Sequence, residues 1–165
     1  MSYDFTNDAG LDKEECEWLT RFCGFHEFKT VLEFGPGNST QAMLDGGVPW
    51  IVSYEHEAEY ACVAMKIFEA YSDRVQIVKY DAMKMPIVPK PECLKFDFAF
   101  IDGPPGRLTI PPRLNAALFC FSRAPIIAIH DCFRDSQLVS ILEDIGMVHA
   151  ALFASKRGIV VLRHT

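Results

Sequence analysis

Short apolar runs alternate with segments of helical periodicity along most of the chain. The runs are rich in β-branched and aromatic residues and predict buried strands over residues 31–34, 50–54, 74–79, 96–101 and 125–130. Apolar residues at helical spacing predict helices near residues 13–22, 41–44, 57–71, 111–121 and 136–145. Two further β-type runs, 148–153 and 158–162, flank a turn signal and predict a closing hairpin. This alternation predicts an α/β fold with a doubly wound, mainly parallel Rossmann-like sheet. Helices should cover both faces, and the C-terminal strand should be antiparallel.

The length and composition fit a single domain over residues 1–165. A chain of 165 residues, half of them apolar, can bury a substantial core without metal or disulfide support. Residues 1–25 form an N-terminal polar segment and a lead-in helix, and the proline- and lysine-rich stretch 82–94 suits a surface loop. We find no repeat or low-complexity segment in the sequence.

The net charge and the spacing of the cysteines limit the classes of partner and the cellular compartment that we expect. The formal charge of −6 gives no overall attraction for nucleic acid or for an anionic membrane, and no apolar run reaches membrane-spanning length. The six cysteines lack the spacing of a zinc site, and the N-terminus does not resemble a signal peptide. We therefore expect reduced thiols, a cytoplasmic location and a small-molecule partner, while the oligomeric state stays open.

A glycine-rich turn follows the first predicted strand. Gly35 and Gly37 interrupt the sequence after the apolar run 31–34, and Asn38, Ser39 and Thr40 then offer side chains that cap a helix. Glycines here let a ligand lie against bare main chain, facing the amides of the helix start. Glu33 sits at the end of the strand, where a buried carboxylate needs hydrogen-bond donors.

Acidic residues recur where the predicted strands end. In open α/β sheets, ligands bind outside the carboxyl ends of the strands, so these residues can share one crevice. They are Glu33, Glu55, Asp81, Asp102 and Asp131. Glu55 lies about twenty positions beyond the glycine turn, the place of a carboxylate that accepts ribose hydroxyls. Thr40 replaces the third glycine of the dinucleotide fingerprint and Glu33 would repel a pyrophosphate, so a nucleoside with a cationic tail fits better.

Together these features resemble the class I S-adenosylmethionine-dependent methyltransferases over nearly the whole chain. The sequence Glu-Phe-Gly-Pro-Gly at 33–37 resembles the first motif of that family, which implies a loop around the methionine part of the cofactor. Glu55 matches the ribose-binding acid, Asp81 and Ala82 match the adenine contacts, and Asp102 falls in the fourth motif beside the methyl group. The resemblance implies these cofactor-binding residues: Glu33, Phe34, Gly35, Pro36, Gly37, Ser39, Thr40, Glu55, His56, Asp81, Ala82 and Asp102.

The fourth motif limits which chemical group we expect to accept the methyl group. No Asn-Pro-Pro-Tyr or Asp-Pro-Pro-Tyr follows the fourth strand, so the chain does not resemble the methyltransferases that act on adenine or glutamine. Asp-Gly-Pro-Pro-Gly at 102–106 instead resembles small enzymes that methylate hydroxyls, including those of sugars. The resemblance therefore implies methyl transfer to a hydroxyl of a small molecule or saccharide. A nicotinamide-dependent oxidoreductase and a non-catalytic binding protein remain as alternatives.

Three residues are the candidates for catalysis. Asp102, His130 and Asp131 follow two predicted strands and can meet at their ends, with His130 as the general base. The competing hypotheses are a histidine that only forms hydrogen bonds, and a divalent metal held by Asp102 and Asp131. Cys132 and Pro105 stand where the metal-dependent catechol-type enzymes have an asparagine and a lysine, and both departures disfavour the metal.

Overall fold

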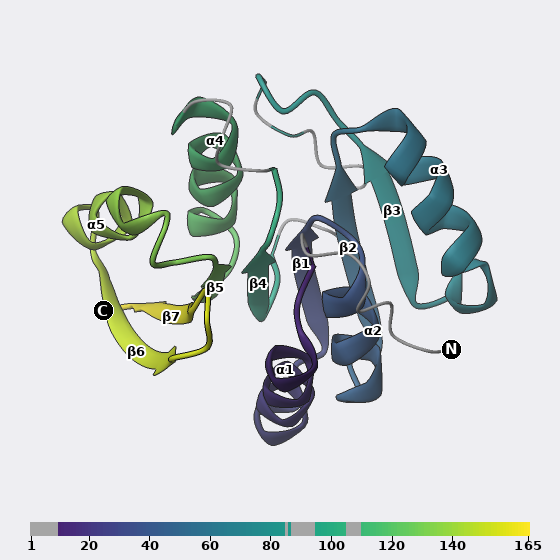
Figure 1. Cartoon of the computed structure of the whole chain (residues 1–165), viewed down its shortest axis with the longest axis horizontal. Helices are drawn as coiled ribbons and strands as arrows, with labels where there is room; N and C mark the ends of the chain where they lie inside the picture. Colours follow the sequence, from purple (N-terminus) through teal and green to yellow (C-terminus); the bar gives the residue numbers. More distant parts are fainter. Residues whose placement is uncertain (1–9, 85, 87–94, 105–109) are drawn as a thin grey trace.

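A computed structural model describes residues 10–84, 86, 95–104 and 110–165 and contains one seven-stranded sheet (Figure 1). The strand order is β3-β2-β1-β4-β5-β7-β6. The strands are β1 (Thr30–Phe34), β2 (Trp50–Glu55), β3 (Val75–Lys79), β4 (Phe98–Ile101), β5 (Ile126–His130), β6 (Met147–Phe153) and β7 (Ile159–His164). The first five pair in parallel, and β7 runs antiparallel to both β5 and β6. The predicted fold class and antiparallel C-terminal strand are confirmed.

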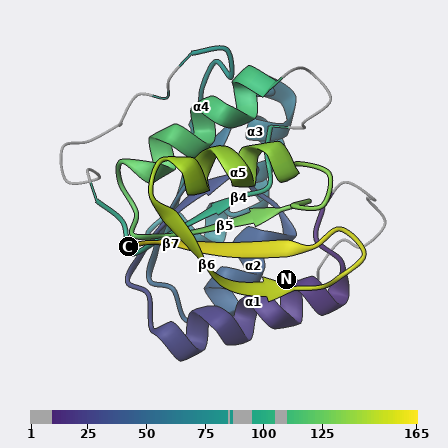
Figure 2. The same cartoon turned by 90° about the vertical axis from the view of Figure 1, so that its left-hand side faces the viewer.

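Helices cover both faces of the sheet. They are α1 (Lys13–His26), α2 (Asn38–Asp45), α3 (Ala58–Ile67), α4 (Ile110–Phe121) and α5 (Ser136–Asp144), with a short 3₁₀ turn η1 (Glu69–Tyr71) after α3. Figure 2 shows α4 and α5 above the sheet and α1 and α2 below it. Buried side chains on these two sides form separate apolar clusters, and the central strands contribute alternate residues to each. This double burial explains why the central strands are almost continuously apolar.

Three helices differ in their boundaries from the sequence prediction. Helix α2 begins at Asn38 rather than near residue 41, so the residues expected to cap it, Asn38, Ser39 and Thr40, form its first turn, and Gly37 is the N-cap. Helix α1 continues to His26 rather than ending near residue 22, because its buried stripe is Cys16, Leu19 and Cys23 at spacings of three and four. Cysteine packs there as a small apolar residue. Helix α3 ends at Ile67, and the chain continues to Tyr71 as the 3₁₀ turn η1. The predicted loop 82–94 falls largely outside the described residues.

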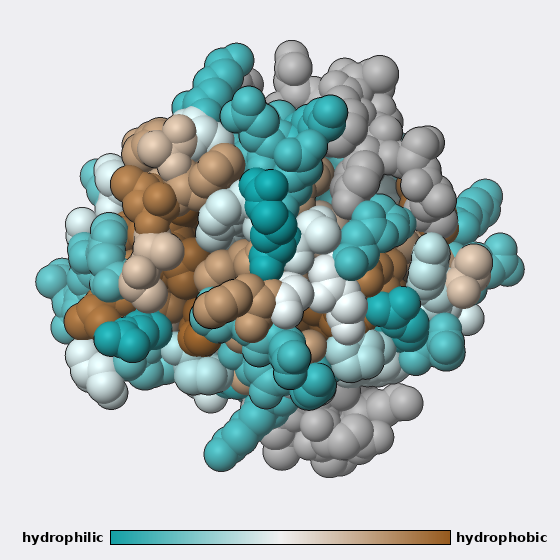
Figure 3. Space-filling view, turned by 90° about the horizontal axis from the view of Figure 1, so that it is seen from below, coloured by the Kyte–Doolittle hydropathy of each residue, from teal (hydrophilic) through white to brown (hydrophobic). Residues whose placement is uncertain are grey.

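Strand β6 forms one edge of the sheet. Its burial differs from that of the central strands, because most of its side chains are exposed, Val148 and Leu152 among them. Figure 3 shows hydrophobic side chains gathered toward the left, the side on which β6 and β7 lie in Figure 1. Within the described ranges, no helix is long and apolar enough to cross a membrane.

Candidate functional site

The turn after β1 contains two glycines in different situations. Gly35 has a φ of +90°, and a Cβ built there would lie 2.8 Å from the backbone nitrogen of Gly103. Glycine is thus required at 35 by the conformation and by the close approach of the two loops. Gly37 has an extended φ of 173°, and no described atom lies within 4 Å of a Cβ built there. The protein itself therefore does not need glycine at 37, whereas a ligand lying against the main chain would.

Glu33 lies fully buried behind this turn. Its carboxyl oxygens accept hydrogen bonds from the hydroxyls of Ser39 and Thr40, both at 2.6 Å. The Thr40 hydroxyl in turn accepts from the amide of Gly37 at 3.0 Å. Burial raises the pKa of the Glu33 carboxyl, the hydroxyl bonds offset this only in part, and the result is about 7. The donors that the sequence required for Glu33 are thus Ser39 and Thr40, in the first turn of α2.

Glu55 is held at the end of β2 with one oxygen engaged. Its Oε1 accepts from the amide of Glu57 and lies beside His56 Nδ1, each at 2.8 Å. The hydrogen bond to Glu55 raises the pKa of the His56 ring. Both contacts go to Oε1, so they fix the carboxylate without occupying Oε2. Among the described residues, Oε2 has no recorded partner.

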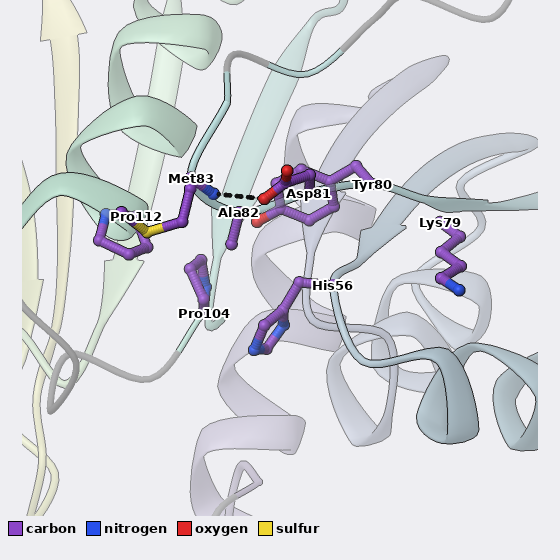
Figure 4. A pocket seen from close by; sticks show the side chains of 8 residues that line it. All are labelled: His56, Lys79, Tyr80, Asp81, Ala82, Met83, Pro104 and Pro112. Carbon is purple, nitrogen blue, oxygen red and sulfur yellow. Dashed lines mark hydrogen bonds between the residues drawn. The ribbon is translucent and has the colours of Figure 1, made fainter.

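A pocket of about 650 Å³ opens beside Glu55, beyond the ends of β2, β3 and β4 (Figure 4). Its lining is mostly apolar and consists of His56, Lys79, Tyr80, Asp81, Ala82, Met83, Pro104 and Pro112. Asp81 is exposed and bonds to the amide of Met83 at 3.0 Å and to Lys84 at 3.0 Å. The buried hydroxyl of Tyr80 has no hydrogen-bond partner among the described residues. Such a group suits a ligand that offers a polar atom to the pocket wall.

His130 links two carboxylates in the interior. Its Nδ1 lies 2.6 Å from Asp102 Oδ1, and its Nε2 lies 3.2 Å from Glu15 Oε2. Burial by itself lowers the pKa of the ring, but these two carboxylates outweigh it and raise the pKa to about 9. The ring is therefore an imidazolium at neutral pH, with both N–H groups donating. This state does not suit the general-base role expected for His130, which needs a neutral ring with a free nitrogen.

Glu15 is a buried partner of His130 from the N-terminal helix. Its Oε2 also accepts from the amide of Asp12 at 2.9 Å, and its Oε1 accepts from the Ser155 hydroxyl at 2.5 Å. Burial raises the pKa of the Glu15 carboxyl, but the bonds from His130, Ser155 and Asp12 outweigh it and lower the pKa to about 2. The buried carboxylate is therefore ionised and well supplied with donors.

Asp131 follows His130 with a left-handed φ of 58°, a conformation uncommon outside glycine. Its carboxylate contacts Arg134 at 2.8 Å and Arg157 at 3.8 Å. One potential ligand atom from each of Asp102, His130 and Asp131 lies within 4.8 Å of the others. The three predicted catalytic residues thus converge, and their arrangement has the dimensions of a possible cation site.

The solved structures similar to this chain include several methyltransferases. The SAH-bound methyltransferase PaMTH1 of Podospora anserina superposes with a TM-score of 0.73 at 17% identity, covering 96% of this chain and 81% of that one. The O-methyltransferase TomG of Streptomyces achromogenes, solved with SAM, gives 0.73 at 15% identity over 96% and 82%. The O-methyltransferase of Bacillus cereus, in complex with SAH, gives 0.69 at 14% identity over 96% and 84%.

The chain has the methyltransferase fold. No protein-family model matches the sequence, and no curated protein does either. At such low identities the shared methyltransferase fold does not by itself carry an activity, so function must be argued from the site.

On this methyltransferase fold, the predicted cofactor residues divide into those that face open space and those that support them. The turn at Gly37 and the pocket beside Asp81 are accessible. Phe34 instead packs in the core, where its ring stacks on Tyr54 at 5.2 Å. The other buried members are Glu33, Ser39, Thr40 and Glu55, the last of which is 8% exposed at the end of β2.

Glu15 and Arg113 were not among the predicted site residues. Glu15 completes a capping box with Asp12, a signal that sequence reasoning assigns to a helix end on the surface. Its partner His130 is 115 positions away, so no local pattern indicates their contact. Arg113 lies in the first turn of α4, where an arginine ordinarily suggests exposure, yet its side chain is 3% exposed.

Proposed function

We propose that this protein is an S-adenosylmethionine-dependent methyltransferase that methylates a hydroxyl group of a small molecule or saccharide. The observation that carries the proposal is the Glu55 carboxylate. It is held through Oε1, with Oε2 unoccupied among the described residues, and it stands directly before His56, which lines the pocket beyond β2 and β3. One fixed carboxylate oxygen there can accept both hydroxyls of a ribose, and the apolar pocket beside it can take a purine ring.

The remaining parts of the site fit the same cofactor. The open main chain at Gly37 leaves room for the amino-acid tail, next to the amides at the start of α2. Glu33, Ser39 and Thr40 support this turn from behind through their hydrogen bonds. S-adenosylmethionine would supply an activated methyl group there, and Pro104, two residues after Asp102, lines the pocket.

We further propose that Asp102 receives the proton of the acceptor hydroxyl. His130 holds Oδ1 of Asp102, which leaves Oδ2 to accept the proton of the acceptor hydroxyl. The bound cofactor would supply the methyl group to the acceptor oxygen and would leave as a neutral thioether, so no residue would need to act as an acid. Orientation of the acceptor supplies the larger part of the acceleration, up to about 7 to 11 kcal/mol, and a placed base adds about 10²- to 10⁴-fold.

A metal-assisted version of the same reaction is the second candidate. The convergence of Asp102, His130 and Asp131 within 4.8 Å favours it, because oxygen and imidazole ligands suit divalent ions. Those residues would hold the ion, and its charge would favour the ionised form of a bound hydroxyl. The residues fit such an ion only if His130 releases one of its two carboxylate contacts.

We also propose a cytoplasmic location. The five cysteines within the described residues are free thiols, as expected of a reducing compartment.

Titration calorimetry tests the cofactor assignment. The wild-type protein should bind S-adenosylmethionine and S-adenosylhomocysteine but not NAD. Glu55→Ala should weaken binding about ten- to a hundredfold, since each lost charge-assisted hydrogen bond is worth about 1.5 to 3 kcal/mol.

Glu59→Ala is the matched control for this experiment. Its carboxylate stands four residues further on, in the exposed first turn of α3. That variant should bind like the wild type. Unchanged affinity in Glu55→Ala would contradict the ribose assignment, and binding without methyl transfer to any hydroxylated acceptor would favour the non-catalytic alternative.

A further inference from the structure

The sheet pairing between β4 and β5 stops just before the candidate catalytic residues. The last paired residues are Ile101 and Ile129, so Asp102 and His130 lie one step beyond the paired positions. Beyond this point the amide of Asp102 continues the pairing of β4 with β1 by donating to the carbonyl of Phe34 at 2.9 Å, while His130 pairs with Ile159 of β7. The β4–β5 ladder therefore does not itself join Asp102 to His130.

The guanidinium of Arg113 lies between these two strand ends. Its Nη1 donates to the carbonyl of Asp102 at 2.9 Å and to that of Pro104 at 3.3 Å. Its Nη2 donates to the carbonyl of His130 at 2.6 Å and to that of Ile101 at 3.2 Å. A single side chain from α4 thus binds both strand ends through backbone carbonyls.

The counter-ion of Arg113 comes from a third element. Asp135, directly before α5, lies with Oδ2 3.0 Å from Arg113 Nε, and both side chains are largely buried. A buried cation is costly unless it is paired and its donors are used, and here the guanidinium has both an ion pair and four carbonyl acceptors. A lysine at this position has one nitrogen on a flexible stem and cannot span the same acceptors.

We propose that Arg113 is a positioning residue of the active site, which holds the hydrogen-bonded side chains of Asp102 and His130 in place by binding the backbone carbonyls of both residues. The 2.6 Å contact between Asp102 Oδ1 and His130 Nδ1 joins side chains whose backbones are linked by the same guanidinium. The proposal rests on the proposed function for its catalytic consequence, whereas the geometric consequence is independent of it.

Arg113→Lys is the test, and Arg123→Lys is its matched control. Arg123 follows the end of the same helix, where it donates to the carbonyl of Phe119 and lies over the Phe119 ring. Both variants remove one guanidinium and keep the positive charge. Two properties should be measured on each: the ring N–H signals of His130 by ¹H–¹⁵N NMR, and kcat and KM for methyl transfer.

The expected result for Arg113→Lys is a displaced or lost His130 Nδ1–H signal. kcat should fall about a hundredfold, the loss that a misplacement of about 1 Å produces, with KM for S-adenosylmethionine unchanged. The control should keep the wild-type signal and kcat. If Arg113→Lys does not fold, Asp135→Asn replaces it. It removes the ion pair to Arg113 Nε, together with the contact of Asp135 to Arg134, and should displace the same signal.

Two results would overturn the proposal. One is an unchanged His130 signal in a folded Arg113→Lys variant, or in Asp135→Asn when that variant replaces it. The other is a loss of activity that follows a matching loss of cofactor affinity. If the wild-type protein transfers no methyl group at all, the proposed function fails, while the NMR comparison still decides whether Arg113 positions the pair.

Discussion

Glu33→Gln tests whether the buried carboxyl behind the glycine turn opposes folding at neutral pH. Glu33 is fully buried, and the donors described above are two neutral hydroxyls, from Ser39 and Thr40. Glutamine has nearly the same shape and carries no charge. A hydroxyl can donate or accept, so one of the two can turn to accept from the new amide.

The magnitude follows from the pKa of Glu33, which burial raises from an ordinary 4.5 to about 7. Below pH 4.5 the carboxyl is protonated in both the folded and the unfolded chain, and the charge has no effect on stability. Between pH 4.5 and 7 the unfolded chain releases the proton while the folded one keeps it. The free energy of unfolding therefore falls as pH rises, by about 1.4 kcal/mol per pH unit and about 3 kcal/mol in all.

Urea unfolding of the wild type and Glu33→Gln across pH 4 to 8.5 measures this loss. The free energy of unfolding of the variant, relative to wild type, should rise by about 3 kcal/mol from the acidic to the alkaline end and then level off above pH 7. Any constant cost of the substitution moves the whole curve and leaves its shape intact. Glu17→Gln, an exposed glutamate on α1, should give a flat difference.

A flat difference for Glu33→Gln as well would refute the reasoning. It would mean that the hydroxyls stabilise the ionised carboxylate as well as water does. A difference that falls with rising pH would mean that the folded state prefers the charge.

Two further predictions concern the turn and the metal. Gly35→Ala should destabilise the fold, because φ at this position is +90° and the added Cβ would meet the loop of Gly103. Gly37→Ala should keep the melting temperature and weaken S-adenosylhomocysteine binding. Calorimetry that shows normal binding in Gly37→Ala would exclude Gly37 from the cofactor site. Methyl transfer should survive EDTA and should fall about 10²- to 10⁴-fold in Asp102→Asn, the range expected for loss of a base. Loss of activity in EDTA with recovery on adding magnesium would instead assign Asp102 and Asp131 to a metal.

The sequence by itself determined the order of the helices and strands. It also determined that the candidate site lies at the carboxyl ends of the parallel strands. Strands and helices can be predicted from local patterns, namely the apolar runs and the periodicity of a few neighbouring residues. These patterns were sufficient to predict a parallel sheet with an antiparallel strand at its C-terminal end. Because ligands bind at the carboxyl ends of such strands, Glu55 and Asp102 could be placed at one edge without coordinates. The need of Glu33 for donors also followed from its position in a buried strand.

Only the tertiary structure decided which of these side chains meet and in what charge state. His130 contacts Asp102, 28 positions away, and Glu15, 115 positions away. The strand order and the packing of α1 on the sheet bring these residues together, and no local sequence pattern predicts that packing. The pKa of His130 depends on both partners, so the direction of its shift could not be judged before Glu15 was located. The burial of Arg113 likewise could not be predicted from local sequence. Arginine side chains are ordinarily exposed, and this one is buried between two strand ends only because α4 packs across the sheet there.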